Sequence, residues 1–475
     1  MAHVEGDSRY QTTLFAPSLD ELVGGAHPIR VIDAFVDGLD MAGLGFAKVV
    51  AEATGRPPYK PSDLLKLYIY GYLNQVRSSR RLAREAERNL EVLWLIRRLS
   101  PSFKTIADFR RDHPAGIVGV CRAFMRFCRD QSLYGAQVLA IDGSKIEAVA
   151  SRKQVITPKS LEKKTASIDR KIAEYLAAMD EADGEEAAEP VVGDVAAALV
   201  ALREQREEVS RQAEQLASEG LSQQVLSEPE ARLMRTARHG HQVAYNAQTA
   251  VDAKHGLIAA FELTNEGNDQ CQLHPMAELG RQALEVETLT VVADTGYSNG
   301  EQGERCEASG ITALVPRPQT VNPKGEQYFS REAFRYDADS DSWQCPAGQT
   351  LTCRQVSQTE QQKKYWTTAC PSCPLKGQCT KSTQRVVVRS FHEDAREAMH
   401  RRAKSDPAWM KLRRNLVEHP FGTMKWLMGL PRFLLRGLRK AKAELALAVL
   451  AFNMKRTMNI RGVPALLRAL HAASA

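Results

Sequence analysis

Three acidic residues that lie far apart in the chain have the surroundings of a metal-dependent site. Asp142 occurs in VLAIDGSKIEA, Asp294 in LTVVADTGYS and Glu418 in RRNLVEHPFGTMK. The first two follow apolar runs rich in Val, Leu and Ile, which predicts that each ends a buried strand. Carboxylate oxygens are the ligands that Mg²⁺ and Mn²⁺ prefer, and two such ions about 4 Å apart commonly drive phosphodiester cleavage. If the fold gathers the three acids, they would form a site of this kind.

Both aspartates also have a structural interpretation. Asp142 is followed by Gly143 between two apolar segments, and Asp-Gly in that setting is a strong hairpin-turn signal. Asp294 is followed by Thr295 and Gly296, so its side chain is also suited to a turn or to the start of a helix. Neither residue alone distinguishes catalysis from a turn.

Glu418 has a more specific setting. Arg414, Glu418 and Lys425 are offset by four and by seven residues, so on a helix they share one stripe. A carboxylate between two cations suits a site that holds both a metal ion and a phosphate. Pro420 removes a backbone hydrogen bond, so the helix is expected to bend or to start there.

Cysteine spacing indicates a second metal site, which is structural. Two cysteines with two residues between them are followed by a third, and an earlier one can complete a four-sulfur set for Zn²⁺. The predicted ligands are Cys345, Cys370, Cys373 and Cys379, with Cys353 as a substitute for Cys345. Reduced, unligated thiols are the alternative. The other cysteines, Cys121, Cys128, Cys271 and Cys306, are expected in the core.

Positive charge is concentrated near the C-terminus. The chain of 475 residues carries a formal charge of +7, yet residues 396 to 456 contain fifteen Lys or Arg against four Asp or Glu, an excess of +11. Such a concentration favours a polyanionic partner, because neutralised phosphates release counterions. A solvated helix face is the alternative.

A second basic region lies between residues 77 and 111. RSSRRLAREAERN and KTIADFRRDH are separated by a break at Ser100 and Pro101, which predicts two helices around a turn, as in a helix-turn-helix DNA reader. A surface stabilised by charge pairs four residues apart is the alternative. The predicted DNA contacts are Arg80, Arg81, Arg84, Arg110 and Arg111.

These residues need a mixed α/β fold to position them. Residues 27 to 134 have apolar spacings of three and four, which predicts helices, and from residue 137 the alternation is that of strands. The later order of strands and helices matches a ribonuclease-H-like mixed sheet core that is interrupted twice. The predicted parts are a helical DNA-binding domain over 1–134, the core over 135–159, 237–319 and 391–460, a helical hairpin insertion over 160–236, a cysteine-rich, zinc-ribbon-like insertion over 320–390 and a tail over 461–475.

With these motifs in this order, the chain resembles the DDE-class transposases of bacterial insertion sequences. The strand ending in IDG, the ADTGYS motif and the R-x3-E-x6-K spacing carry the resemblance in the core. HPIRVIDAFVD, PYKPSDLLKLYIYGYL and SFKTIADFR resemble the helical amino-terminal domain of the same transposases. The resemblance covers nearly the whole chain.

The resemblance implies roles for individual residues. Asp142, Asp294 and Glu418 would bind two Mg²⁺ or Mn²⁺ ions, and Arg414 and Lys425 would contact DNA near the cleaved end. Lys411 stands where related enzymes often have a tyrosine, and we expect it to contact DNA. Tyr297 matches the Gly-Tyr pair of the family and is expected to support packing or DNA.

The function implied is binding of terminal inverted repeats, cleavage at the element's ends and transfer of the freed 3′-OH to target DNA. Pairing two ends calls for a homodimer. No P-loop pattern occurs, so no nucleotide cofactor is expected. The N-terminus lacks the pattern of a signal peptide and no apolar run is long enough for a membrane span, so we expect a cytoplasmic, nucleoid-associated protein. The alternatives are an inactive DNA-binding remnant and a host nuclease built on the same core.

Overall fold

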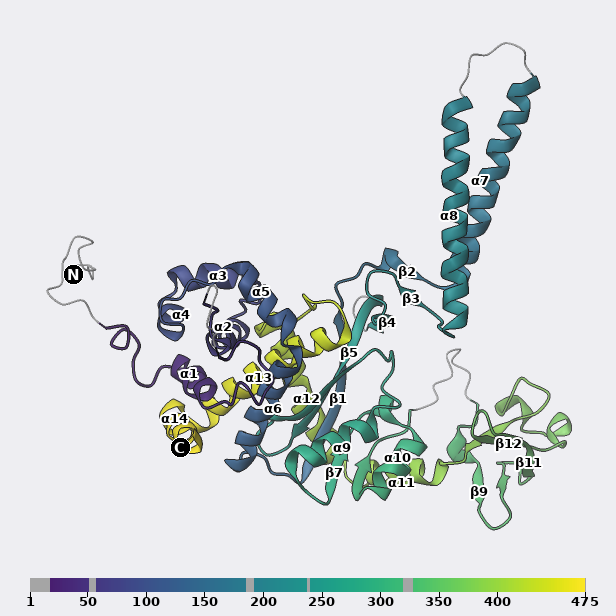
Figure 1. The fold of residues 1–475 in the computed structure, drawn as a ribbon. Coiled ribbons are helices and arrows are strands. Elements are labelled where there is room, and N and C mark those ends of the chain that lie inside the picture. The colour runs from purple at the N-terminus through teal and green to yellow at the C-terminus, as the bar shows by residue number, and fades with distance from the viewer. Residues whose placement is uncertain (1–17, 51–56, 185–191, 237–239, 319–327, 475) are drawn as a thin grey trace, which may run out of the picture.

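The computed structural model describes residues 18–50, 57–184, 192–236, 240–318 and 328–474. It is a mixed α/β structure in which helices surround a mixed sheet, a long helical hairpin projects from the body, and a small second sheet lies to one side (Figure 1). The α/β class expected from the sequence is thus confirmed. Within the described ranges, no helix is both long and apolar enough to cross a membrane.

Helices form the N-terminal part of the body. Ser102 caps one of them by accepting a hydrogen bond from the Thr105 backbone N–H, and Pro61 occupies the first turn of another, where its missing N–H costs nothing. The helices are α1 (Ile29–Asp37), α2 (Pro61–Leu73), α3 (Ser79–Arg88), α4 (Leu90–Leu95), α5 (Phe103–Asp112) and α6 (Pro114–Asp130). The two predicted basic helices correspond to α3 and α5, with α4 between them.

Two C-terminal helices pack among these N-terminal ones. α13 (Leu438–Arg461) contacts α2 and α6, and α14 (Val463–Ser474) contacts α1. The middle of α13 is buried on all sides, as expected of a helix rich in Ala and Leu along its whole circumference. One hydrophobic core therefore runs from the N-terminal helices into the sheet.

The main sheet has six strands. β1 (Val138–Glu147) pairs antiparallel with β5 (Gly240–Asp252) and parallel with β7 (Leu289–Val292), which is followed by parallel β8 (Ile311–Leu314). The other edge of β5 pairs with β4 (Arg232–Thr236) and β6 (Ile258–Thr264). β1 runs straight through Asp142, which lies opposite Thr249, so Asp142 neither ends its strand, as predicted, nor forms a hairpin turn.

Helices beside the sheet complete the core. α9 (Leu273–Leu284) packs on β6, β1 and β5, and α10 (Gly300–Ala308) lies between α9 and α11 (Glu393–Ser405). α12 (Ala408–Gly422) packs on β1 and continues without a break through Pro420 into a π-helical turn over Thr423–Leu427. The proline therefore neither starts nor ends this helix.

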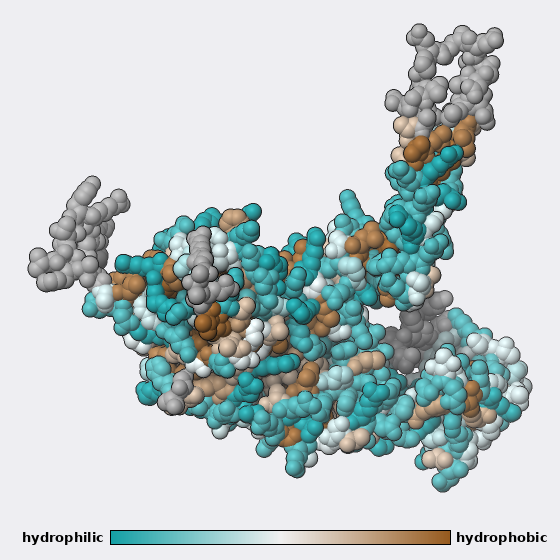
Figure 2. Space-filling view, viewed as in Figure 1, coloured by the Kyte–Doolittle hydropathy of each residue, from teal (hydrophilic) through white to brown (hydrophobic). Residues whose placement is uncertain are grey.

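Two long helices lie in the segment for which we predict a helical hairpin. α7 (Pro158–Gly184) and α8 (Val192–Ser218) share a narrow apolar seam, and short strands β2 (Val155–Ile156) and β3 (Gln224–Val225) pair at the base. Figure 2 shows a mostly hydrophilic surface on this face, with hydrophobic residues gathered high on the described part of the hairpin. Tyr175, Leu176 and Val200 are exposed there.

The second sheet has five strands in the order β13-β12-β11-β10-β9. They are β9 (Arg335–Asp337), β10 (Ser342–Gln344), β11 (Thr350–Ser357), β12 (Gln362–Trp366) and β13 (Val387–Ser390). Phe334, Trp343, Leu351 and Tyr365 form a small core of its own. The cysteine-rich segment thus has an apolar core in addition to its cysteines.

Candidate active site

The fold places the Asp142 and Asp294 carboxylates against the same guanidinium group, that of Arg413. Asp142 lies within β1, past its last pairing with β7, and Asp294 lies two residues after the end of β7. The Asp294 carboxylate accepts a hydrogen bond of 2.8 Å from the Gly296 backbone N–H, which caps the 3₁₀ turn Thr295–Tyr297. Arg413 Nη2 lies 2.6 Å from Asp142 Oδ1 and 3.1 Å from Asp294 Oδ2. Two parallel strands and α12 therefore meet at a pair of carboxylates.

Arg413 occupies the inward face of α12. Val417, Phe421 and Met424 are buried and follow Arg413 at offsets of four, eight and eleven, which places them on one helical stripe. Arg414, which we predicted to act in the site, is exposed on another face. The apolar stripe was the signal in the sequence that distinguishes the two adjacent arginines.

Burial and mutual repulsion make a nearby positive charge favourable for the two aspartates. Burial raises the pKa of Asp142 to about 6, the positive charge of Arg413 opposes this shift, and the nearby negative charge of Asp294 adds to it. Two carboxylates held this close are unfavourable unless a positive charge lies between them. Hard oxygen donors around one cationic group fit a divalent ion such as Mg²⁺.

Glu418 lies outside this contact. It is exposed on α12, five residues after Arg413 and so about 140° around the helix. Its side chain makes no hydrogen bond or ion pair with the part of the chain that the structure describes. In that same part, no three Asp, Glu, His or Cys side chains are arranged to hold one metal ion.

The other predicted DNA contacts near the site differ in exposure. Lys425, in the π-helical turn, donates hydrogen bonds of 2.6 Å to Ser144 Oγ and 2.8 Å to the Lys145 carbonyl oxygen. It therefore fixes the C-terminal half of β1 from the same side as Arg413. Lys411 and Arg414 are exposed on α12.

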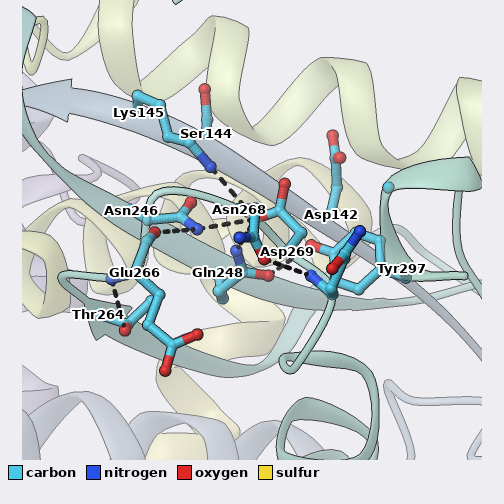
Figure 3. A network of polar contacts seen from close by, with 12 residues as sticks. Asp142, Ser144, Lys145, Asn246, Gln248, Thr264, Glu266, Asn268, Asp269 and Tyr297 are labelled. Atoms are coloured by element: carbon cyan, nitrogen blue, oxygen red, sulfur yellow. Dashed lines mark hydrogen bonds and ion pairs between the residues drawn. The ribbon is translucent and has the colours of Figure 1, made fainter. Parts of the chain in front are cut away.

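A partly buried polar network that the sequence did not reveal lies beside Asp142 (Figure 3). Asp269, in the loop between β6 and α9, accepts hydrogen bonds from Lys145, Asn246 and Gln248. The Tyr297 hydroxyl donates to Gln248 Oε1. Burial raises the pKa of Tyr297 well above its ordinary value, so this hydroxyl keeps its proton. Tyr297 thus supports packing, as the resemblance implied.

The N-terminal arginines divide into exposed and paired residues. Arg80, Arg81 and Arg84 on α3 are exposed, and the Arg80 guanidinium lies 5.4 Å from the ring centre of Phe103. Arg111 is exposed but bonded to Asp108 and Asp112.

Arg110 has a different role from the one predicted. It is buried, 3.8 Å from Glu444 on α13, and Glu444 also lies 3.5 Å from Arg77. A buried arginine that neutralises a buried glutamate offers no charge to DNA, so Arg110 is not available as a DNA contact in this structure. Its partner Glu444 is more than 300 residues away in sequence, so this ion pair could not be predicted from the local sequence pattern.

The four predicted zinc ligands line a single small cavity. Cys345, Cys370, Cys373 and Cys379 surround it, and Cys353 does not. Burial raises the pKa of Cys379, Arg385 opposes the shift, and the three other thiols add to it. Among the remaining cysteines, Cys121, Cys128 and Cys306 are buried as expected, whereas Cys271 is exposed in the loop before α9, so its predicted core position is wrong.

Two family models match the chain. One, described as "Transposase domain (DUF772)", covers residues 17–112, and the other, "Transposase DDE domain", covers residues 344–458. The second includes α12 with Arg413 and Glu418. These matches confirm the resemblance to DDE-class insertion-sequence transposases at both ends of the chain.

A solved structure is also similar, though distantly. It is the piggyBac transposase synaptic complex with hairpin DNA, with 8% identity, a TM-score of 0.32, and coverage of 94% of this chain and 79% of that one. A likeness this weak carries no argument. No curated protein matches the chain significantly.

Proposed function

We propose that this protein is a transposase that binds the terminal inverted repeats of its element, cuts the DNA there and joins the 3′ ends to a target. One observation carries the proposal: Asp142 and Asp294, from neighbouring parallel strands, converge on one cation in a chain that matches transposase domains.

The strand order supports a ribonuclease-H-like core. Three antiparallel strands, β6, β5 and β1, are followed by parallel β7 and β8. In this arrangement β1 contains Asp142, and its parallel neighbour β7 ends just before Asp294, so the two aspartates lie close together. The two insertions leave the pairing of these strands intact.

Asp142, Asp294 and Glu418 are the residues that would hold two divalent ions. When bound, the ions would activate the attacking oxygen and stabilise the leaving oxygen of the phosphodiester. Arg413 meanwhile neutralises the two aspartates, and Lys425 holds β1 in register with α12.

Glu418 joins the pair only if α12 rotates or shifts. The irregular backbone of the π-helical turn after Gly422 is the place where such a change disturbs the fewest regular hydrogen bonds. Release of Arg413 from the aspartates would accompany the movement.

DNA is the proposed partner of the basic surfaces. Arg80, Arg81 and Arg84 present three exposed cations on α3, and Lys411 and Arg414 present two on α12. A homodimer would pair two element ends. An inactive remnant and a host nuclease are the competing functions, and inverted repeats beside the gene separate the transposase from the nuclease.

A structural Zn²⁺ in the cysteine cavity completes the proposal. The cavity is lined by four cysteines, of which Cys370 and Cys373 come from one 3₁₀ turn, and four thiolates are a donor set that suits zinc. The sulfurs would close around the ion on binding.

The decisive experiment compares cleavage with binding. Asp142→Ala and Asp294→Ala are expected to abolish Mg²⁺-dependent nicking of an end-containing DNA fragment and to leave its binding in a gel-shift assay largely unchanged. Asp339→Ala, which removes an exposed acid of the second sheet's domain, is the control and should cut normally. Cleavage by both active-site variants would overturn the proposal.

A further inference from the structure

The polar network around Asp269 supports the aspartate pair from the other face of β1. Side chains alternate along a strand, so Gly143 and Lys145 point away from the side on which Asp142 and Ser144 lie. Asn246 and Gln248, on β5, lie opposite Lys145 and Gly143 in the register. The network is thus directly beneath the candidate site.

Glycine at position 143 lets the network approach. A Cβ at this position would lie 2.3 Å from Gln248 Nε2 and 2.8 Å from Asp269 Oδ1. Any side chain would push both groups away from the backbone that follows Asp142. In the Asp-Gly pair that resembled a turn, Asp142 therefore supplies a carboxylate of the site, and Gly143 leaves room for Gln248 and Asp269.

The two carboxylate oxygens of Asp269 differ in their hydrogen bonds. Oδ1 accepts from Lys145 Nζ at 3.2 Å, from Asn246 Nδ2 at 2.7 Å and from Gln248 Nε2 at 2.7 Å. Oδ2 makes no hydrogen bond within the described ranges and lies 3.9 Å from the position of a Cβ on Gly296. It thus faces the turn that carries Asp294.

Two paths connect Asp269 to the aspartate pair. The first is mechanical: Gln248 bonds to Asp269 through its amide nitrogen and accepts from Tyr297 through its oxygen, and Tyr297 ends the turn that Asp294 caps. The second is electrostatic: the negative charge of Asp269 acts on Asp142, with Lys145 as its counterion.

We propose that Asp269 is a positioning residue for divalent-ion binding: it fixes the Asp294 turn through Gln248 and Tyr297, and its charge increases the affinity of the Asp142–Asp294 pair for the ion. The inference rests on the proposed function, because it concerns the ion that the pair would hold. Asp269 itself need not touch that ion.

The negative charge of Asp269 should raise the affinity for a divalent ion, and the positive charge of Lys145 should lower it. Removing each charge should therefore change the affinity in opposite directions. In the full-length protein without DNA, Mn²⁺ binding is measured by the loss of the free-ion signal in electron paramagnetic resonance. Asp269→Asn should weaken Mn²⁺ binding about tenfold, which corresponds to roughly 1.4 kcal/mol. Lys145→Met leaves Asp269 without its counterion and should tighten binding.

A matched control comes from the same loop. Glu266 loses the same charge in Glu266→Gln, but its carboxylate points away from Asp142 (Figure 3), so Mn²⁺ affinity should stay unchanged. Thermal melting without metal checks that each variant folds. Equal Mn²⁺ affinity in Asp269→Asn and wild type, or weakened binding in Lys145→Met, would overturn the inference, since a purely structural role moves both variants the same way.

Asp142→Ala separates this inference from the proposed function. If Asp142→Ala still binds Mn²⁺ as wild type does, the aspartate pair is not the metal site and the proposed function fails. If Asp142→Ala loses binding while Asp269→Asn keeps it, only the role of Asp269 fails.

Discussion

Arg413 Nη2 lies 2.6 Å from Asp142 Oδ1 and also reaches Asp294, so a side chain from the C-terminal third occupies the position between two acids of the sheet. If the pair binds a metal ion as proposed, that ion and the Arg413 guanidinium would compete for the same carboxylate oxygens.

Removing the Arg413 charge should make the protein depend on metal for stability. In Arg413→Gln the two partly buried carboxylates lose their shared cation, and we expect a loss of about 1–2 kcal/mol in the presence of a chelator. Mg²⁺ should restore more stability to this variant than it adds to wild type. Thermal melts with and without Mg²⁺ measure the difference. Arg414→Gln, the exposed neighbour, is the control, and an identical Mg²⁺ response in the two variants would contradict the prediction.

The Tyr297 hydroxyl should contribute measurably to stability. Tyr297→Phe leaves the buried Gln248 oxygen without its donor, which costs about 1–3 kcal/mol. Urea unfolding checks this value. Tyr175→Phe on the exposed side of α7 removes the same atom and should change stability by less than about 0.5 kcal/mol. Equal effects at both positions would argue against the buried hydrogen bond.

A pH-dependent contribution is expected in the second sheet. Hydrogen bonds from Lys363, Tyr365 and Tyr336 lower the pKa of Asp341 to about 2. Because the folded pKa lies below the ordinary value of 3.8, this carboxylate stabilises the fold fully above that value and loses its effect as pH falls toward 2. Asp341→Asn should therefore lower the melting temperature at pH 7, and the difference from wild type should shrink between pH 5 and pH 3. A difference independent of pH would exclude this ionisation as its source.

Zinc removal should destabilise the cysteine-rich segment selectively. Purified protein is expected to contain about one Zn²⁺ per chain by elemental analysis, and a strong chelator should increase hydrogen exchange in β10, β11 and β12 but not in β1 or β5. Cys370→Ser should have the same effect as chelation. The exposed Cys271→Ser is the control. Full protection of these strands after complete zinc removal would assign their stability to the aromatic core alone.

The exposed arginines of α3 should govern the salt dependence of DNA binding. Replacing Arg80, Arg81 and Arg84 together by Gln should weaken binding and reduce the slope of log affinity against log salt by about 2–3. Arg111→Gln, whose charge is already neutralised by Asp108 and Asp112, should change the slope little. Fluorescence anisotropy over a salt series measures both. An unchanged slope in the triple variant would place the DNA elsewhere.

The sequence predicted what depends on local pattern. Apolar runs indicated β1, which contains Asp142, and β7, which ends two residues before Asp294. The break at Ser100 and Pro101 indicated that α3 and α5 are separate helices, and the segment of α7 and α8 was predicted as a helical hairpin. A two-residue turn signal at Asp142 and Gly143 competed with the strand, but β1 pairs with β5 without interruption through both residues, and Gly143 leaves room for Gln248 and Asp269.

What the sequence did not predict depends on contacts between distant segments. Asp269 lies in a polar loop with no pattern of its own, and only the pairing of β6 with β5 brings it under β1. The choice between Arg413 and Arg414 followed a family spacing, whereas the buried stripe through Val417 and Phe421 decides which of them faces the sheet.

The burial of Glu444 between Arg77 and Arg110 has a consequence for incomplete chains. The N-terminal helices receive part of their interior from α13, which is synthesised more than 300 residues after them. A product of premature termination would keep the arginines of α3 yet lack the packing that holds them in place. If α3 binds DNA as proposed, such a fragment would compete poorly with the full-length protein for that DNA.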